Sequence, residues 1–89
     1  MKAIVTVVGQ DKIGIIAAVS SCLSKLQVNI LDIRQTTMQE YFTMMMLVDT
    51  ASCTVDTATL QKTLAELGNE IGEDIRLQHE DIFNSMHRV

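Results

Sequence analysis

The order in which apolar residues change their spacing limits this chain to very few folds. Over short segments rich in β-branched residues, the apolar positions alternate or run together, which is typical of strands. Over two longer segments they recur every three or four residues, which is typical of helices that bury one face. Read from the amino terminus, the predicted order is strand, helix, strand, strand, helix, strand.

Four segments are predicted as strands because each is short, apolar and bounded by polar residues or glycine. They are Lys2 to Val8, Asn29 to Met38, Tyr41 to Asp49 and Asp74 to Gln78. Only Gln39 and Glu40 separate the second strand from the third, so we expect these two strands to form a hairpin.

The two helices are predicted from their apolar stripes. The stripe of the first is Ile16, Val19, Leu23 and Leu26, and that of the second is Leu60, Leu64, Leu67 and Ile71. Asp11 and Asp56 are expected to accept hydrogen bonds from the free amides at the two helix starts. Gly72 is placed to end the second helix in the left-handed conformation, whereas Gly68 inside that helix is expected to cost about 1 kcal/mol relative to alanine.

This order is an internal duplication of a split strand-helix-strand unit. Right-handed crossovers then place both helices on one face of an antiparallel sheet. The predicted fold is therefore a ferredoxin-like α+β sandwich with a four-stranded sheet. The 89 residues are expected to form a single domain, with a core over residues 1–78 and a carboxy-terminal tail over residues 79–89. Ile82, Phe83 and Met86 predict a short helix in that tail.

The far face of the sheet is predicted to be covered as well. Both sides of the sheet carry apolar residues, because Val5 and Val7 alternate with Ile4 and Val8 in the first strand, and Phe42, Met44, Met46 and Val48 alternate with Met45 and Leu47 in the third, while the helices cover one side only. Soluble monomers rarely expose such a patch, so we expect either a second copy of the sheet or the apolar residues of the tail to lie on it. Because so short a chain buries a modest share of its surface, self-association is expected to add stability. Met38 and Met44 to Met46 are expected to be packing residues.

Composition and charge argue against several classes of function. Lys and Arg number 7 and Asp and Glu number 11, which gives a net charge of -4, and aromatic residues make up only 3%. Binding to nucleic acid or to an anionic membrane is therefore disfavoured. The longest run without a charged residue, Ile13 to Ser24, is too short to span a bilayer. Cys22 and Cys53 are expected to be reduced thiols in a cytoplasmic protein, and no cofactor is expected.

The segment from Gly9 to Gly14 is the most informative motif. Its glycines have the spacing of a phosphate loop, but Ile15 and Ile16 occupy the positions of the required lysine and hydroxyl residue. Asp11 would also repel a nucleotide. Unpaired amides around residues 13–15, at the positive end of a helix, are left to bind a small carboxylate. Alternatively, the glycines only permit a tight turn and close packing of the helix on the sheet.

No catalytic or metal-binding constellation is predicted. His79 and Glu80 begin like a zinc-protease helix, but Phe83 stands where the second histidine is required. A metal site of His79 with His87 is a less favoured alternative to a solvated tail. The serines of the first helix and both cysteines lack a recognisable base partner. We therefore predict a protein that is not an enzyme.

Several segments together resemble an ACT domain. They are Val7 to Ala17, which includes the glycine loop, and Val28 to Ile30 at the head of the second strand. Met1 to Val8, Glu40 to Met45 and Ile82 to Met86 resemble more narrowly a group of free-standing, single-domain ACT proteins of uncharacterised function. That group is similar to the ACT modules of the glycine-cleavage-system regulators. The likeness covers nearly the whole chain.

The resemblance implies a regulatory module that binds a small effector, commonly an amino acid, where two copies meet edge to edge through their second strands. The ligand loop would comprise Gly9, Gln10, Asp11, Lys12, Ile13, Gly14 and Ile15, and the partner's Asn29 and Ile30 would complete the pocket. The loop amides would take the ligand carboxylate, Asp11 its ammonium group, and the amide of Asn29 either of them. Ile13 stands where many ACT loops have proline, which makes the helix entry less rigid.

The expected assembly is a dimer or tetramer that transmits ligand binding to a partner enzyme or regulator. One alternative is a pure interaction module without a ligand, whose buried sheet face is its only function. Another is a small enzyme such as an acylphosphatase, which shares the topology. That activity requires an arginine in the loop after the first strand, and the arginines of this chain are Arg34, Arg76 and Arg88.

Overall fold

The structure is a computed structural model that describes residues 1–81, and it contains the predicted helices and strands in the predicted order. The elements are β1 (Lys2–Gln10), α1 (Ile15–Lys25), β2 (Asn29–Met38), β3 (Tyr41–Asp49), α2 (Thr57–Ile71) and β4 (Glu73–His79). β1 is longer than predicted because Gly9 and Gln10 continue the antiparallel pairing with β3. The predicted terminal helix lies mostly in residues 82–89, outside the described residues.

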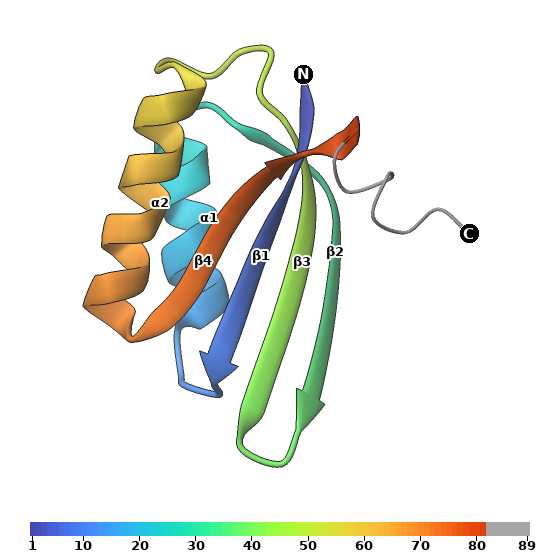
Figure 1. The fold of residues 1–89 in the computed structure, drawn as a ribbon, viewed down its shortest axis with the longest axis vertical. Coiled ribbons are helices and arrows are strands. Elements are labelled where there is room, and N and C mark those ends of the chain that lie inside the picture. The colour runs from blue at the N-terminus through green and yellow to red at the C-terminus, as the bar shows by residue number, and fades with distance from the viewer. Residues whose placement is uncertain (82–89) are drawn as a thin grey trace.

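The four strands form one antiparallel sheet in the order β2-β3-β1-β4. The two helices lie together on one side of this sheet (Figure 1). β2 and β3 form the predicted hairpin, which Gln39 closes in the left-handed conformation at a φ of 56°. The ferredoxin-like α+β sandwich with its βαββαβ order is therefore confirmed.

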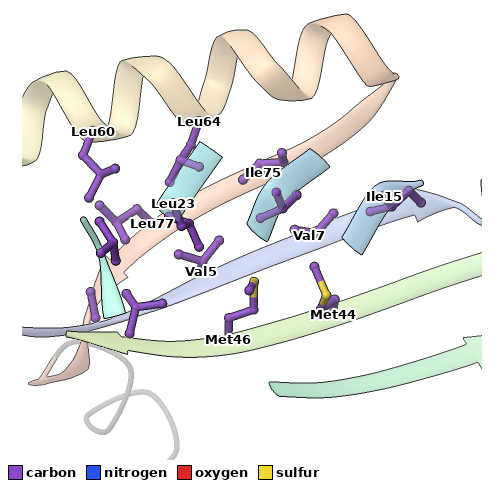
Figure 2. Close-up of a cluster of buried hydrophobic side chains, with 14 of the residues drawn as sticks. Val5, Val7, Ile15, Leu23, Met44, Met46, Leu60, Leu64, Ile75 and Leu77 are labelled. Carbon is purple, nitrogen blue, oxygen red and sulfur yellow. The ribbon is translucent and has the colours of Figure 1, made fainter. Parts of the chain in front are cut away.

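The core lies between the helices and the side of the sheet that faces them (Figure 2). The sheet contributes alternate residues of three strands, namely Ala3, Val5, Val7, Phe42, Met44, Met46, Val48, Ile75 and Leu77. The helices contribute Ile15, Val19, Leu23, Leu60 and Leu64. Met44 and Met46 are thus packing residues, as predicted, whereas Met38 at the end of the edge strand is 70% exposed because no helix covers it.

The start of α1 differs from the prediction in two respects. The residue that precedes the helix is Gly14, at a φ of 89°, and no side chain caps the helix there, so the prediction that Asp11 is the cap is wrong. The inward stripe begins at Ile15, which is buried, whereas Ile16 is 40% exposed. Val19 and Leu23 are buried as predicted, and Ile15 joins them because it lies four and eight residues before them on the same side of the helix.

α2 begins and ends as predicted. The carboxylate of Asp56 accepts a hydrogen bond from the amide of Thr59 at 2.8 Å, and Gly72 ends the helix at a φ of 72°. Gly68 is buried, and a Cβ there would lie 2.5 Å from the carbonyl oxygen of Glu73. The glycine thus permits α2 to pack closely on β4, which offsets its cost within the helix.

β2 forms the edge of the sheet away from both helices (Figure 1). Its pairing with β3 shifts by one residue between Ile30 and Asp32, so Leu31 is the extra residue of a bulge. Beyond the bulge, Ile33, Gln35 and Thr37 pair with core residues of β3 and share their helix-facing side. No residue of β2 is fully buried, because the helices reach only its start, where Ile30 packs against the core.

The side of the sheet opposite the helices is partly exposed. Ile4 is buried, Met45 and Leu47 are half-buried, and Val8 is 45% exposed. Whether a second copy or the tail covers this face stays a prediction, because residues 82–89 lie outside the described part. Within residues 1–81, no helix combines the length and the apolar character needed to cross a membrane.

The cap of α2 predicts a pH-dependent contribution to stability. The Thr59 side chain and then its amide hold the pKa of Asp56 below its ordinary value of 3.8, so the cap stabilises the fold above that value. We expect Asp56→Ala to lower the melting temperature near neutral pH. The difference from the parent chain should shrink as the pH falls below about 3.8 and the carboxylate takes up a proton. Thermal denaturation followed by circular dichroism measures this. Glu66→Ala, in the exposed middle of α2, is the control, and a pH-independent difference for Asp56→Ala would contradict the assignment.

Candidate functional site

The loop that joins β1 to α1 is anchored at two points. The amide of Asp11 donates to the carbonyl oxygen of Glu40 at 2.7 Å, which ties the loop to the β2-β3 hairpin. The ammonium group of Lys12 donates to the carbonyl oxygen of Ile71 at 2.9 Å, which ties the loop to the end of α2. A cation is favoured at that position because the last carbonyls of a helix carry partial negative charge. The loop is therefore connected both to the sheet, through the β2-β3 hairpin, and to the helical layer, through α2.

Between these anchors, the start of α1 presents free donors. The first hydrogen bond of the helix runs from the amide of Ala18 to the carbonyl oxygen of Gly14, at 2.9 Å. The amides of the three residues between them, 15–17, have no acceptor among residues 1–81. Such amides, at the positive end of a helix, bind carboxylate or phosphate oxygens. Gly14 adds no side chain that would block their approach.

A groove of about 560 Å³ lies beside these amides. Its lining residues come from the loop, from one face of α1 and from β3, and they are Asp11, Lys12, Gly14, Ile15, Ile16, Ala17, Ser20 and Phe42. The lining is largely apolar, and it includes the exposed acidic residue Asp11. This arrangement can hold a small molecule that has a carboxylate, an ammonium group and an apolar part.

The other predicted site residues lie elsewhere in the chain. Asn29 and Ile30 line a separate groove of about 450 Å³ with Ser20, Ser24, Gln27 and Val28. They follow α1, whose 11 residues span about 16 Å, while the loop precedes it. A single chain therefore does not bring Asn29 to the glycine loop. Ser20 lines both grooves and marks where they approach each other.

The individual loop residues differ in what they can contribute. The side chain of Ile15 is buried in the core, so only its amide can reach a ligand. Ile13 is fully exposed at the tip of the loop, and Gln10 is exposed at the end of β1. Gly9 is held against β4, because the carboxylate of Glu73 occupies the space next to its Cα. Gly9 thus has a packing role, and its contact with a ligand stays a prediction.

Glu73 is a feature that the sequence did not indicate. Glu73 is only 6% exposed, and both of its carboxylate oxygens are buried without a hydrogen-bond partner among residues 1–81. It pairs with Gly9 across the sheet, so its side chain lies on the helix-facing side under the loop. A Cβ on Gly9 would lie 2.5 Å from one of these oxygens.

Sequence reasoning also missed the groove residues Ile16, Ser20 and Phe42. The spacing of Ile16 and Ser20, four residues apart, places them on one side of α1, beside the buried stripe. Phe42 follows the same alternation that makes Met44 and Met46 inward-facing. These patterns are visible in the sequence. The groove itself follows only from the way α1 packs on the sheet, which decides the side of the helix that borders the groove.

The remaining candidates for chemistry do not assemble into a site. Nδ1 of His79 accepts from the amide of Asp81 at 3.0 Å, and His87 lies outside the described residues. Residues 1–81 contain no group of His, Cys, Asp and Glu that could hold a metal ion. Cys22 is a half-buried free thiol packed on the core, and burial raises its pKa, which disfavours the reactive thiolate.

The profile of the ACT domain family matches residues 2–78. The chain belongs to the ACT domain family. It is 55% identical to a UPF0237 protein of Clostridium acetobutylicum over 89 residues, which is 100% of each chain. A solved ACT domain protein from Streptococcus pneumoniae is 43% identical, with a TM-score of 0.82 over 93% of both chains.

A more distant ACT relative is part of a larger protein. A putative glycine cleavage system transcriptional repressor of known structure is 26% identical, with a TM-score of 0.73. That match covers 86% of this chain and 44% of the repressor chain. The predicted resemblance to ACT proteins, including those related to glycine-cleavage-system regulators, is therefore confirmed.

The contact between Gly9 and Glu73 predicts a pair of compensating substitutions. We expect Gly9→Ala to lower the free energy of unfolding by about 1–3 kcal/mol, because the new methyl group overlaps the Glu73 carboxylate. Glu73→Ala introduced into the same chain should restore most of this loss, because it removes the overlapping atoms. Urea denaturation of the two single variants and the double variant measures the coupling.

Gly14→Ala is the matched control for this experiment. A Cβ at Gly14 has open space, but its φ of 89° strains any residue with a side chain. Gly14→Ala should therefore also destabilise the chain, and Glu73→Ala should not restore it. Equal recovery of both alanine variants would show that the Glu73 contact is not the cause.

Proposed function

We propose that this ACT domain is a small-molecule-sensing regulatory module that binds an amino acid at the glycine loop. The main support is the start of α1, where free amides lie beside a groove that Asp11 helps to line. The amides would hold the ligand carboxylate and Asp11 the ligand ammonium group. The apolar lining from Ile16, Ala17 and Phe42 favours an aliphatic side chain.

The site requires a second copy of the chain. Asn29 and Ile30 lie at the far end of α1 from the loop of their own chain, so they reach a loop only across a subunit boundary. Two copies that pair through their β2 edges would bring these residues to the partner's loop. The ligand then stabilises the paired state, since binding to one state of an equilibrium shifts the population toward it.

The regulated partner would be an enzyme or a regulator in the cytoplasm. The match to a putative glycine cleavage system transcriptional repressor is consistent with a regulatory role. About half of that repressor chain lies outside the match and could carry a further function. Ligand-dependent assembly would be read by this partner.

A direct titration tests the ligand. We expect one or a few small or aliphatic amino acids to bind and to raise the melting temperature, because a ligand at 100 times its Kd adds about 2.7 kcal/mol. Isothermal calorimetry with each of the common amino acids identifies the ligand. Asp11→Ala and Asn29→Ala should each weaken its binding by about tenfold or more, because each removes a hydrogen bond to a charged group.

Asn69→Ala is the control, because Asn69 is exposed on α2 and lines neither groove. Binding that all three variants retain unchanged would place the ligand elsewhere. Absence of both heat and thermal shift at millimolar concentrations would leave the second candidate function, a pure interaction module. The bare β2 edge is the observation that favours that alternative.

A further inference from the structure

The side of the sheet opposite the helices, called here the open side, is unevenly exposed, although α1 and α2 both lie on the other side (Figure 1). Ile4 in β1 is only 8% exposed, and Leu47, its neighbour in β3, is half-buried. Val8, which lies four residues farther along β1 on the same side, is 45% exposed. Tyr41, at the hairpin end of β3, is 60% exposed. Exposure of the open side therefore falls from the hairpin end of the sheet toward the opposite end.

β4 follows the same trend. On its open side, Asp74 and Arg76 are exposed, whereas Gln78, which pairs with Ile4, is half-buried. β4 is an edge strand, and it ends at His79, opposite the start of β1. The chain therefore leaves the sheet beside the least exposed part of the open side.

A helix begins directly after β4. Glu80 and Asp81 are helical, and Nδ1 of His79 accepts a hydrogen bond from the amide of Asp81 at 3.0 Å, as the side chain of a capping residue does. Acidic side chains in the first turn are favoured by the positive end of the helix. The chain thus starts a new helix at the point where it leaves the sheet.

The sequence after this start has the pattern of a helix with one apolar side. Ile82, Met86 and Val89 recur after four and three residues, and Phe83 lies beside them, whereas Asn84 falls on the opposite side. Neither glycine nor proline interrupts residues 80–89. Because short helices are marginal in water by themselves, such a segment requires an apolar surface on which to pack.

The open side is the nearest free apolar surface. On the helix-facing side, α2 packs along β4, and Nε2 of Gln61 donates to the carbonyl oxygen of Leu77 at 3.4 Å. As a helix, residues 80–89 would span about 15 Å. Neighbouring strands lie about 5 Å apart. The segment is therefore long enough to cross from the edge strand β4 over β1 to β3.

The exposure of individual residues indicates the direction of the segment. A helix that ran along β1 would cover Val8 and leave Leu47 and Met45 open. The opposite is found, because Val8 is exposed while Leu47 and Met45 are half-buried. Arg34, which pairs with Met45 from the far edge strand β2, is exposed as well. The covered area is therefore confined to β1 and β3 near the end of β4.

We propose that residues 82–89 continue the helix that begins at Glu80, and that its apolar side packs across β1 and β3 of the same chain. Ile82, Phe83 and Met86 would then lie over Ile4 and Leu47. This inference goes beyond the proposed function and does not depend on a ligand. It assigns this part of the open side to the chain's own tail rather than to the sheet of a second copy.

Methyl groups on both surfaces provide a direct test on the parent chain. With isotope-labelled methyl groups of Ile, Leu, Val and Met, we expect nuclear Overhauser effects from Met86 to Ile4 and Leu47, and none from Met86 to Val8. A mixture of labelled and unlabelled chains distinguishes contacts within one chain from contacts between two. Absence of effects between the tail and the sheet would overturn the proposal. Effects that occur only between two chains would also overturn it, because the cover would then be the tail of a second copy.

Paired substitutions test the same contact through stability. We expect Met86→Ala to lower the melting temperature of the parent chain by about 4 °C or more, because it removes buried side-chain atoms. In a chain that already carries Leu47→Ala, Met86→Ala should lower the melting temperature by less, because part of the contact is already lost.

Val8→Ala is the matched control on the sheet, because Val8 lies on the same side but outside the covered area. In a chain with Val8→Ala, the loss from Met86→Ala should equal that in the parent chain. Asn84→Ala, on the polar side of the tail, should leave the melting temperature unchanged. A Met86→Ala variant as stable as the parent chain, or equal losses in the Leu47→Ala and Val8→Ala chains, would refute the placement.

Discussion

The feature on which the rest of the structure depends is that two helices cover three strands of a four-stranded sheet. α1 and α2 bury the helix-facing side chains of β1, β3 and β4 in one core, and the edge strand β2 remains outside that core. Apart from Ile30, which packs against the core, the residues of β2 are therefore not covered by the helices. A fold of this design is stable as a unit and at the same time incomplete at one edge.

The glycine loop lies at the end of this core. Its backbone is held by several contacts, while some of its hydrogen-bond donors have no acceptor among residues 1–81. Asp11 and Lys12 tie it to the β2-β3 hairpin and to α2, and Gly9 is packed against Glu73. These contacts hold the backbone in place while Gly14 leaves the first amides of α1 without an acceptor. A rigid loop with free donors is preorganised for a small anion, because little ordering is needed on binding.

Much of the fold could be predicted because it follows from local patterns. The alternation in β3 identified Met44 and Met46 as core residues, and Asp56 and Gly72 identified the two ends of α2. The candidate site was predicted less completely. Asp11 is not the cap of α1, because Gly14 precedes the helix in the left-handed conformation. Ile15 rather than Ile16 faces the core, because Ile15 lies on the same side of the helix as Val19 and Leu23. The burial of Glu73 could not be foreseen, since a carboxylate between a glycine and an aspartate is typical of a solvated turn.

By itself, the sequence determined the order of the elements, the apolar face of each one and the position of the glycine loop, because these depend on spacing along the chain. The tertiary structure decided which strand lies at the bare edge and which residues line the groove beside α1. It also decided that the bulge at Leu31 turns Ile33, Gln35 and Thr37 toward the helix side. Such features depend on which segments become neighbours, and neighbours are chosen by packing across the whole sheet rather than by any one segment.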